Sequence, residues 1–166
     1  MEVRYVNAKD NFLDISEIYE KSWKFAYRGM IPDGYLDSIQ KGRWANCIAD
    51  RHNLVMTENN QMIGTASFEK SRWKQYCDCG EIVSIYLLPA YMGKGYGQYL
   101  LNACVKELRK NGFRKIVLWV LEENQRARRF YERNGFLCTN IFMKDTIGGK
   151  DLREVMYVLT DPGLES

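Results

Sequence analysis

A glycine-rich turn at 92–98, Met-Gly-Lys-Gly-Tyr-Gly-Gln, constrains the fold of this chain more than any other segment. It follows a run rich in Ile, Val and Tyr at 81–88, which favours a strand. It precedes 98–111, where apolar residues at 100, 101, 104, 105 and 108 mark one face of a helix. A second apolar run at 115–121 is typical of a strand covered on both sides. Strands joined by a helical crossover run parallel, so a strand–helix–strand unit forms the centre of the fold.

The rest of the chain extends this unit into a mixed sheet. Apolar spacing predicts a helix over 12–26 and shorter helices over 33–39 and 43–50. Asn124 can cap a further helix, which Asn-Gly at 134–135 ends. Further strands are expected at 2–6, 53–57, 62–69, 136–144 and 153–159, with a loop at 71–80 and antiparallel hairpins around 58–61 and 148–149. We therefore predict an α/β (α+β) fold, in which a mixed central sheet of about seven strands has helices on both faces. Because no linker divides the chain, one domain over 1–166 is expected.

Composition argues against several classes of protein. The net charge of +3 over 166 residues lacks the concentrated basic stripe of a nucleic-acid-binding protein. No run of 18 apolar residues suits a membrane span, and residues 1–10 lack an apolar signal core. An odd number of cysteines, five, then favours reduced thiols in a cytoplasmic protein. Cys77 and Cys79 have no second cysteine pair to complete a zinc site, so no metal is expected.

The turn at 92–98 has the properties of an anion-binding site. Gly93, Gly95 and Gly97 lack the Cβ atoms that would keep a ligand away from the backbone. Successive N–H groups can point into one concavity, and the start of the following helix adds roughly half a positive charge. Such a site suits a diphosphate, although the turn taken alone also fits a glycine-rich turn without a ligand.

Two nucleotide-binding motifs do not match this turn. A Walker loop needs Gly-x4-Gly-Lys-Ser/Thr, which is not present. A Rossmann fingerprint that begins at Gly93 needs its third glycine where Gln98 stands. A nucleotide-dependent enzyme of another class is therefore disfavoured.

Two motifs together resemble the signature of the GNAT N-acetyltransferase superfamily. The turn resembles the family loop Gln/Arg-x-x-Gly-x-Gly/Ala, with Gly95 and Gly97 in place and Met92 where the family has Gln or Arg. The segment 124–136, Asn-Gln-Arg-Ala-Arg-Arg-Phe-Tyr-Glu-Arg-Asn-Gly-Phe, is similar to the family's Asn-x-x-Ala-x-x-x-Tyr-x-x-x-Gly-Phe. The close match covers about a third of the chain, 81–136. It implies the GNAT acyl-CoA N-acyltransferase fold, with acetyl-CoA in a V-shaped gap between strands 81–88 and 115–121.

The resemblance also implies which residues hold acetyl-CoA. A β-bulge in the strand at 81–88 would free backbone groups from the ladder. These groups would bond the pantetheine amides, and one N–H would polarise the thioester carbonyl as an oxyanion hole does. The implied cofactor-binding residues are Ile85, Tyr86, Leu87, Met92, Gly93, Lys94, Gly95, Tyr96, Gly97, Gln98, Asn124, Ala127 and Tyr131.

Direct attack of an amine on the thioester requires a proton acceptor and a proton donor. Deprotonating a lysine-like amine at pH 7 costs about 4 to 5 kcal/mol, and a nearby carboxylate can accept that proton. By resemblance, Glu81 is the candidate general base, since several family members carry a glutamate there that acts through water; an exposed strand-end charge is the alternative. Tyr131 is the candidate general acid, because its phenol is protonated at neutral pH and it shares a helix face with Asn124. His52 as a base and Cys138 as a nucleophile are disfavoured.

The irregular segments 22–35 and 71–80 are expected to bind the acceptor. Aromatic rings can hold a cation over their faces, and Trp23 and Tyr27 are the substrate-binding candidates. Phe25, Trp73 and Tyr76 can join them, with simple packing as the alternative. We expect transfer of the acetyl group of acetyl-CoA to a primary amine of a small-molecule or peptide acceptor. The alternative is a non-catalytic acyl-CoA-binding sensor. Since dimers are frequent in this family, a homodimer is also expected.

Overall fold

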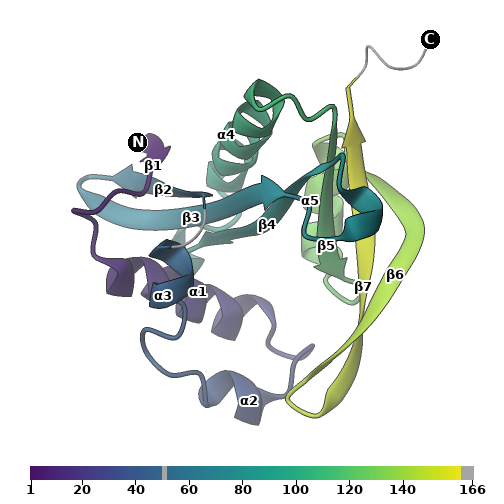
Figure 1. Ribbon diagram of the computed structural model, residues 1–166. Coiled ribbons are helices and arrows are strands. Elements are labelled where there is room, and N and C mark those ends of the chain that lie inside the picture. Colours follow the sequence, from purple (N-terminus) through teal and green to yellow (C-terminus); the bar gives the residue numbers. More distant parts are fainter. Residues whose placement is uncertain (50–51, 162–166) are drawn as a thin grey trace.

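The computed structural model describes residues 1–49 and 52–161, which form a seven-stranded mixed sheet with helices on both faces (Figure 1). The strand order is β1-β2-β3-β4-β5-β7-β6. The predicted fold class and number of strands are thus confirmed. The strands are β1 (Glu2–Tyr5), β2 (His52–Glu58), β3 (Gln61–Lys70), β4 (Gly80–Leu87), β5 (Lys115–Leu121), β6 (Leu137–Ile147) and β7 (Lys150–Thr160).

Helices lie on the two faces of the sheet in separate groups (Figure 1). They are α1 (Phe12–Ala26), α2 (Asp33–Asp37), α3 (Ala45–Ala49), α4 (Tyr96–Lys110) and α5 (Gln125–Arg133). The apolar sides of α4 and α5 pack into the largest core cluster, while α1, α2 and α3 pack on the opposite face. None of the helices within 1–49 and 52–161 is long and apolar enough to cross a membrane.

Most predicted boundaries agree with the structure. Helix α1 and strand β5 have the predicted bounds, and α5 begins after its Asn124 cap as expected. The helix expected over 43–50 is confirmed only as α3, and its predicted last residue, Asp50, lies outside the described residues. The segment 71–80, expected to be a loop, contains the short 3-10 turn η1 (Lys74–Tyr76) and the first residue of β4; a second such turn, η2 (Pro89–Tyr91), follows that strand.

The parallel strands β4 and β5 pair only at one end and then separate. Their register consists of Gly80 with Ile116 and Glu81 with Val117. On its other side, β4 pairs with β3, where Ile82 lies opposite Phe68 and Ser84 opposite Ser67. Val83 is therefore an extra residue, the β-bulge expected in this strand, and bulges bend a strand away from its ladder. A V-shaped gap opens beyond the bulge, between the ends of β4 and β5.

The closing hairpin is antiparallel as predicted, but its second strand lies inside the sheet. Strand β7 pairs with β5 along seven residue pairs, from Lys115 opposite Thr160 to Leu121 opposite Glu154. Strand β6 is left at the sheet edge, paired with β7 alone. This order brings Glu154 beside the end of β5, where the gap between β4 and β5 is open.

Candidate functional site

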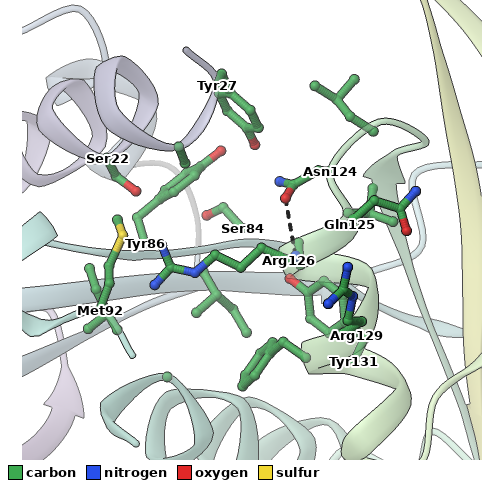
Figure 2. A pocket seen from close by; sticks show the side chains of 18 of the residues that line it. Ser22, Tyr27, Ser84, Tyr86, Met92, Asn124, Gln125, Arg126, Arg129 and Tyr131 are labelled. Atoms are coloured by element: carbon green, nitrogen blue, oxygen red, sulfur yellow. Dashed lines mark hydrogen bonds between the residues drawn. The ribbon is translucent and has the colours of Figure 1, made fainter. Parts of the chain in front are cut away.

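A cavity of about 880 Å³ occupies the gap between β4 and β5 (Figure 2). Its walls come from the end of α1, from β4, from the glycine turn before α4, from the end of β5 and from α5. Segments far apart in the sequence thus meet there, and one residue of β7, Glu154, joins them. The site expected from the two sequence motifs lies within this cavity.

The glycine turn presents free backbone donors to the cavity. Gly93 and Gly95 have φ angles of 77° and 88°, which L-residues rarely adopt. Because Gly95 caps α4 in this left-handed conformation, the helix begins at Tyr96, two residues before the predicted start. Within the described chain, no hydrogen bond engages the N–H groups of residues 93–97. A Cβ built on Gly95 would meet no atom within 4 Å, so the space beside these donors is open.

Three arginines of α5 line the same end of the cavity. Arg126, Arg129 and Arg133 recur at a spacing of three and four residues, which places them on one helix face. A guanidinium nitrogen of Arg126 lies 3.9 Å from the position that a Cβ of Gly93 would take. In the described ranges, no carboxylate pairs with any of the three. The sequence analysis missed these arginines, although their helical spacing was a usable signal.

Asn124 and Tyr131 are held by α5 on the cavity wall (Figure 2). The Asn124 side chain accepts a hydrogen bond from the Ala127 N–H at 3.1 Å, which fixes the start of the helix. The ring of Tyr131 packs against Phe130 and Phe136, with centroids 5.2 and 5.8 Å away. Burial, with a smaller contribution from Tyr86, holds the pKa of Tyr131 well above its usual value. The phenol therefore stays protonated at neutral pH.

Aromatic residues of α1 and β4 form the wall opposite α5. Tyr27 lines the cavity, whereas Trp23 does not and donates its indole N–H to the Tyr86 hydroxyl at 2.9 Å. The expectation that Trp23 contacts the acceptor directly thus needs correction: in this structure it supports the wall. Burial raises the pKa of Tyr27 to about 12 and that of Tyr86 well above its usual value. Both rings are neutral at physiological pH.

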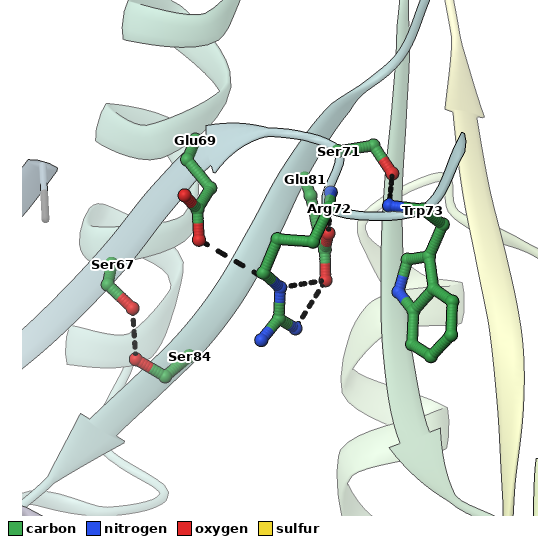
Figure 3. A network of polar contacts seen from close by, with 7 residues as sticks. All are labelled: Ser67, Glu69, Ser71, Arg72, Trp73, Glu81 and Ser84. Atoms are coloured by element: carbon green, nitrogen blue, oxygen red, sulfur yellow. Dashed lines mark hydrogen bonds and ion pairs between the residues drawn. The ribbon is translucent and has the colours of Figure 1, made fainter. Parts of the chain in front are cut away.

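Glu81 does not line the cavity, in contrast to the expectation from the sequence. Figure 3 shows its carboxylate in contact with Arg72. The Glu81 side chain is 1% exposed and lies under Arg72. The carboxylate accepts the Arg72 backbone N–H at 3.0 Å and its guanidinium Nη2 at 2.6 Å. A carboxylate held in this way fixes the segment before β4 onto the strand and does not reach an amine in the cavity. A carboxylate that touches the acceptor directly must therefore come from another element.

Truncating the partner of Glu81 should destabilise the protein. We expect Arg72→Ala to lower the free energy of unfolding by about 2 kcal/mol, because a buried carboxylate then keeps only one backbone donor. Urea unfolding followed by circular dichroism measures this change. Arg28→Ala is the matched control, since the Arg28 side chain is as exposed as that of Arg72 but pairs with the exposed carboxylates of Asp33 and Asp37. Equal stability of both variants would contradict an anchoring role for the pair.

Most of the other predicted site residues gather at the cavity. The predicted residues that line it are Ile85, Tyr86, Leu87, Met92, Gly93, Gly95, Gly97, Gln98, Asn124, Ala127, Tyr131 and Tyr27. The side chains of Lys94 and Tyr96 turn away, towards Tyr91 and Glu58. Phe25 lines the cavity, whereas Trp73, Tyr76, His52 and Cys138 do not.

The fold and the cavity combine a splayed pair of parallel strands, a glycine turn at a helix start and a tyrosine on the next helix. This combination is typical of one class of acyltransferases. The chain belongs to the GNAT acetyltransferase family, whose model matches residues 13–136. It is 24% identical to a spermidine N(1)-acetyltransferase of Thermoplasma acidophilum over 95% of this chain and 98% of that protein. It is 34% identical to a ribosomal protein bS18-alanine N-acetyltransferase of Haemophilus influenzae over 63% of this chain and 69% of that protein.

Solved structures show the same fold. A PaiA N-acetyltransferase of Thermoplasma acidophilum in complex with coenzyme A superposes with a TM-score of 0.76 at 23% identity, covering 96% of this chain and 98% of the other. The YncA protein of Salmonella typhimurium with acetyl-CoA gives 0.74 at 23% identity, over 96% and 93% of the two chains.

Proposed function

We propose that this protein binds acetyl-CoA in the cavity and transfers its acetyl group by direct attack to a primary amine of a small-molecule or peptide acceptor. The observation that supports this most is the row of unengaged N–H groups at 93–97, which opens α4 and faces the arginines of α5. Two relatives are named for amine acceptors of these two kinds, spermidine and a protein alanine. In this proposal residues 1–166 act as one cytoplasmic domain, and a homodimer stays a prediction.

The glycine turn would hold the diphosphate of the cofactor. Five backbone donors and the positive end of α4 favour an anion at this place. The guanidinium of Arg126, close to Gly93, adds a mobile positive charge that a diphosphate can use. Since these donors are fixed by the fold, little ordering is required when the ligand binds. The pantetheine arm would then extend into the gap between β4 and β5.

The reacting end would lie between the bulged part of β4 and Tyr131. Beyond Glu81 the edge of β4 that faces β5 has no strand partner in the described chain, so its backbone groups are available to the arm and to the thioester oxygen. Tyr131 keeps its proton and can give it to the departing thiolate. The cavity thus offers both a donor for the developing oxyanion and an acid for the leaving group.

A direct assay tests the proposal. Release of free thiol from acetyl-CoA is followed with a panel of alkylamines, amino acids and peptides, and calorimetry measures the affinity for CoA. We expect CoA to bind and at least one amine class to be acetylated. No measurable CoA affinity, or no turnover with any amine, would reject the proposal.

The arginine stripe gives a prediction about cofactor affinity. The double variant Arg126→Gln/Arg129→Gln should bind CoA about 30- to 700-fold more weakly, because each of the two lost charge-assisted contacts to a phosphate is worth about 1 to 2 kcal/mol. The loss should shrink as salt is raised, since exposed charges are screened. Lys106→Gln, an exposed cation on the far part of α4, is the control. Calorimetry at two salt concentrations measures the CoA affinity of the double variant and of the control. If the double variant binds CoA as tightly as the wild type, the phosphates do not lie beside these arginines.

A further inference from the structure

Glu154 brings a carboxylate to the cavity from an unexpected strand. It lies on β7 directly opposite Leu121, the last residue of β5. Residues in such a pair have Cβ atoms about 5 Å apart on the same face of the sheet. Leu152, two positions away on the same side of β7, packs with Leu121 and with Leu36 of α2, on the face of the sheet that carries α1 and α2. Glu154 therefore enters the gap from that face, whereas Tyr131 enters it from the face of α4 and α5.

The carboxylate of Glu154 is free to meet a ligand. In the described part of the chain, no hydrogen bond or ion pair is made by this side chain, although it is only partly exposed. The other carboxylate on the cavity wall, Glu123, is held by Lys150 at 3.1 Å. Glu81, nearby on β4, is held by Arg72. Because an unpaired and partly buried carboxylate is costly to a fold, a cationic group of a ligand placed beside it would be stabilising.

The groups that face Glu154 determine how strongly its carboxylate binds a proton. Burial raises the pKa of Glu154 first, and the negative charges of Asp145 on β6 and Glu81 on β4 raise it further. Arg72, before β4, acts in the opposite direction. At the end of α1, the Tyr27 hydroxyl is close enough to both Glu154 and Tyr131 for each to raise its pKa. A carboxylate in such surroundings is a stronger proton acceptor than an exposed one.

We propose that Glu154 binds the ammonium group of the acceptor and takes its proton before attack, so that the acceptor is a protonated alkylamine. This inference rests on the proposed acetyl transfer and names the substrate class and the base of the same site. The ring of Tyr27, which lines the cavity together with Glu154 and Tyr131, would form the wall along which the amine reaches the thioester.

The proposed steps account for every proton. Glu154 takes one proton from R–NH3⁺, and the free amine attacks the thioester carbon to form the C–N bond. When the C–S bond breaks, the thiolate takes the proton of Tyr131. The second proton of the amine nitrogen restores the phenol, and Glu154 returns its proton to water. The products are the N-acetylamine, CoA thiol and one proton.

Two acceptors of different basicity test this role. With n-butylamine, which is protonated at neutral pH, we expect Glu154→Gln to lower kcat/KM at pH 7 by about 100-fold. The loss should shrink as the pH rises towards the pKa of the amine itself. With methoxyamine, which is already a neutral NH2 amine at neutral pH, the loss should stay below about threefold. The affinity for CoA should not change.

Glu122→Gln serves as the matched control. Glu122 lies two residues before Asn124, is exposed and pairs with Arg153, and it does not line the cavity. Its variant should acetylate both amines at the wild-type rate. Two results would overturn the role of Glu154 and leave acetyl transfer standing. One is a Glu154→Gln variant with the wild-type kcat/KM for n-butylamine. The other is an equal decrease in kcat/KM for n-butylamine and methoxyamine. If the wild type neither binds CoA nor acetylates either amine, the proposed function itself fails.

A stability measurement separates a functional role from a structural one. Because the pKa of Glu154 is higher in the folded chain than in the unfolded one, the folded state binds more protons in the window above the unfolded value. Stability therefore falls as the pH rises through this window, and the carboxylate weakens the fold at neutral pH. Glu154→Gln should melt at pH 7 at the same temperature as the wild type or higher. A clear decrease in the melting temperature would show that Glu154 serves the fold.

Discussion

Removing the hydroxyl of Tyr131 is expected to lower kcat about 100- to 1000-fold and to leave the affinity for CoA within about threefold. The phenylalanine of Tyr131→Phe keeps the ring that packs against Phe130 and Phe136, so the helix and the cavity wall should be preserved. The leaving thiolate, however, loses the acid on its side of the gap. Steady-state kinetics together with calorimetry measure the two quantities separately.

Tyr99→Phe is the control for this substitution, because Tyr99 is 55% exposed on α4 and away from the cavity lining. It should leave both kcat and CoA affinity unchanged. Full activity of Tyr131→Phe would show that another group protonates the thiolate. If CoA binds but no amine is acetylated even by the wild type, the sensor alternative gains support and the transferase proposal fails.

A methyl group at position 95 is expected to weaken CoA binding about 100-fold. The φ angle of Gly95 is 88°, and its Cβ would project into the open space where the diphosphate is proposed to lie. A loss of about 2.7 kcal/mol corresponds to this factor. The affinity of Gly95→Ala for CoA, measured by calorimetry, tests the expectation directly.

Gly112→Ala is a control with nearly the same backbone. Gly112 has a φ angle of 87°, has no atom within 4 Å of the position that a Cβ would take, and ends α4 far from the turn. Both alanines should cost about 1 to 2 kcal/mol of stability through the left-handed conformation. Only Gly95→Ala should affect CoA. Equal affinities in the two variants would move the diphosphate away from this turn.

The sequence predicted the centre of the fold better than its closing part. Periodic apolar residues defined α1 and β5, and the glycine turn placed β4, α4 and β5 in one parallel unit. The hairpin of β6 and β7 was also predicted, but the insertion of β7 next to β5 was not. Pairing between distant strands depends on how complete faces of the sheet pack, and the residues around Glu154 contain no local pattern that predicts pairing with β5.

The two motifs located the cofactor end of the site, because backbone conformation there is set by nearby glycines and by the Asn124 cap. The acceptor end was harder to predict. Glu81 occupies a strand position that can face a ligand, yet the loop before it supplies Arg72 and closes over it. Trp23 has the right chemistry for a cation, but its side chain does not line the cavity and instead donates to Tyr86, which does. Contacts between segments that are distant in the sequence determine where both side chains lie. Such contacts leave no regular spacing of residues from which they could be predicted.

The short register between β4 and β5 has a mechanical consequence. Two residue pairs, at Gly80 and Glu81, provide the only ladder between the β1–β4 half and the β5–β7 half of the sheet in the described chain. Elsewhere the halves are joined by side-chain packing, under α4 and α5 on one face and around Cys79, Val117 and Met156 on the other. A long molecule lying in the gap, with hydrogen bonds to both strands, would take the place of a missing rung. Binding of such a molecule would stiffen the sheet where the ladder between β4 and β5 is short, so the cofactor would also connect the two halves of the sheet.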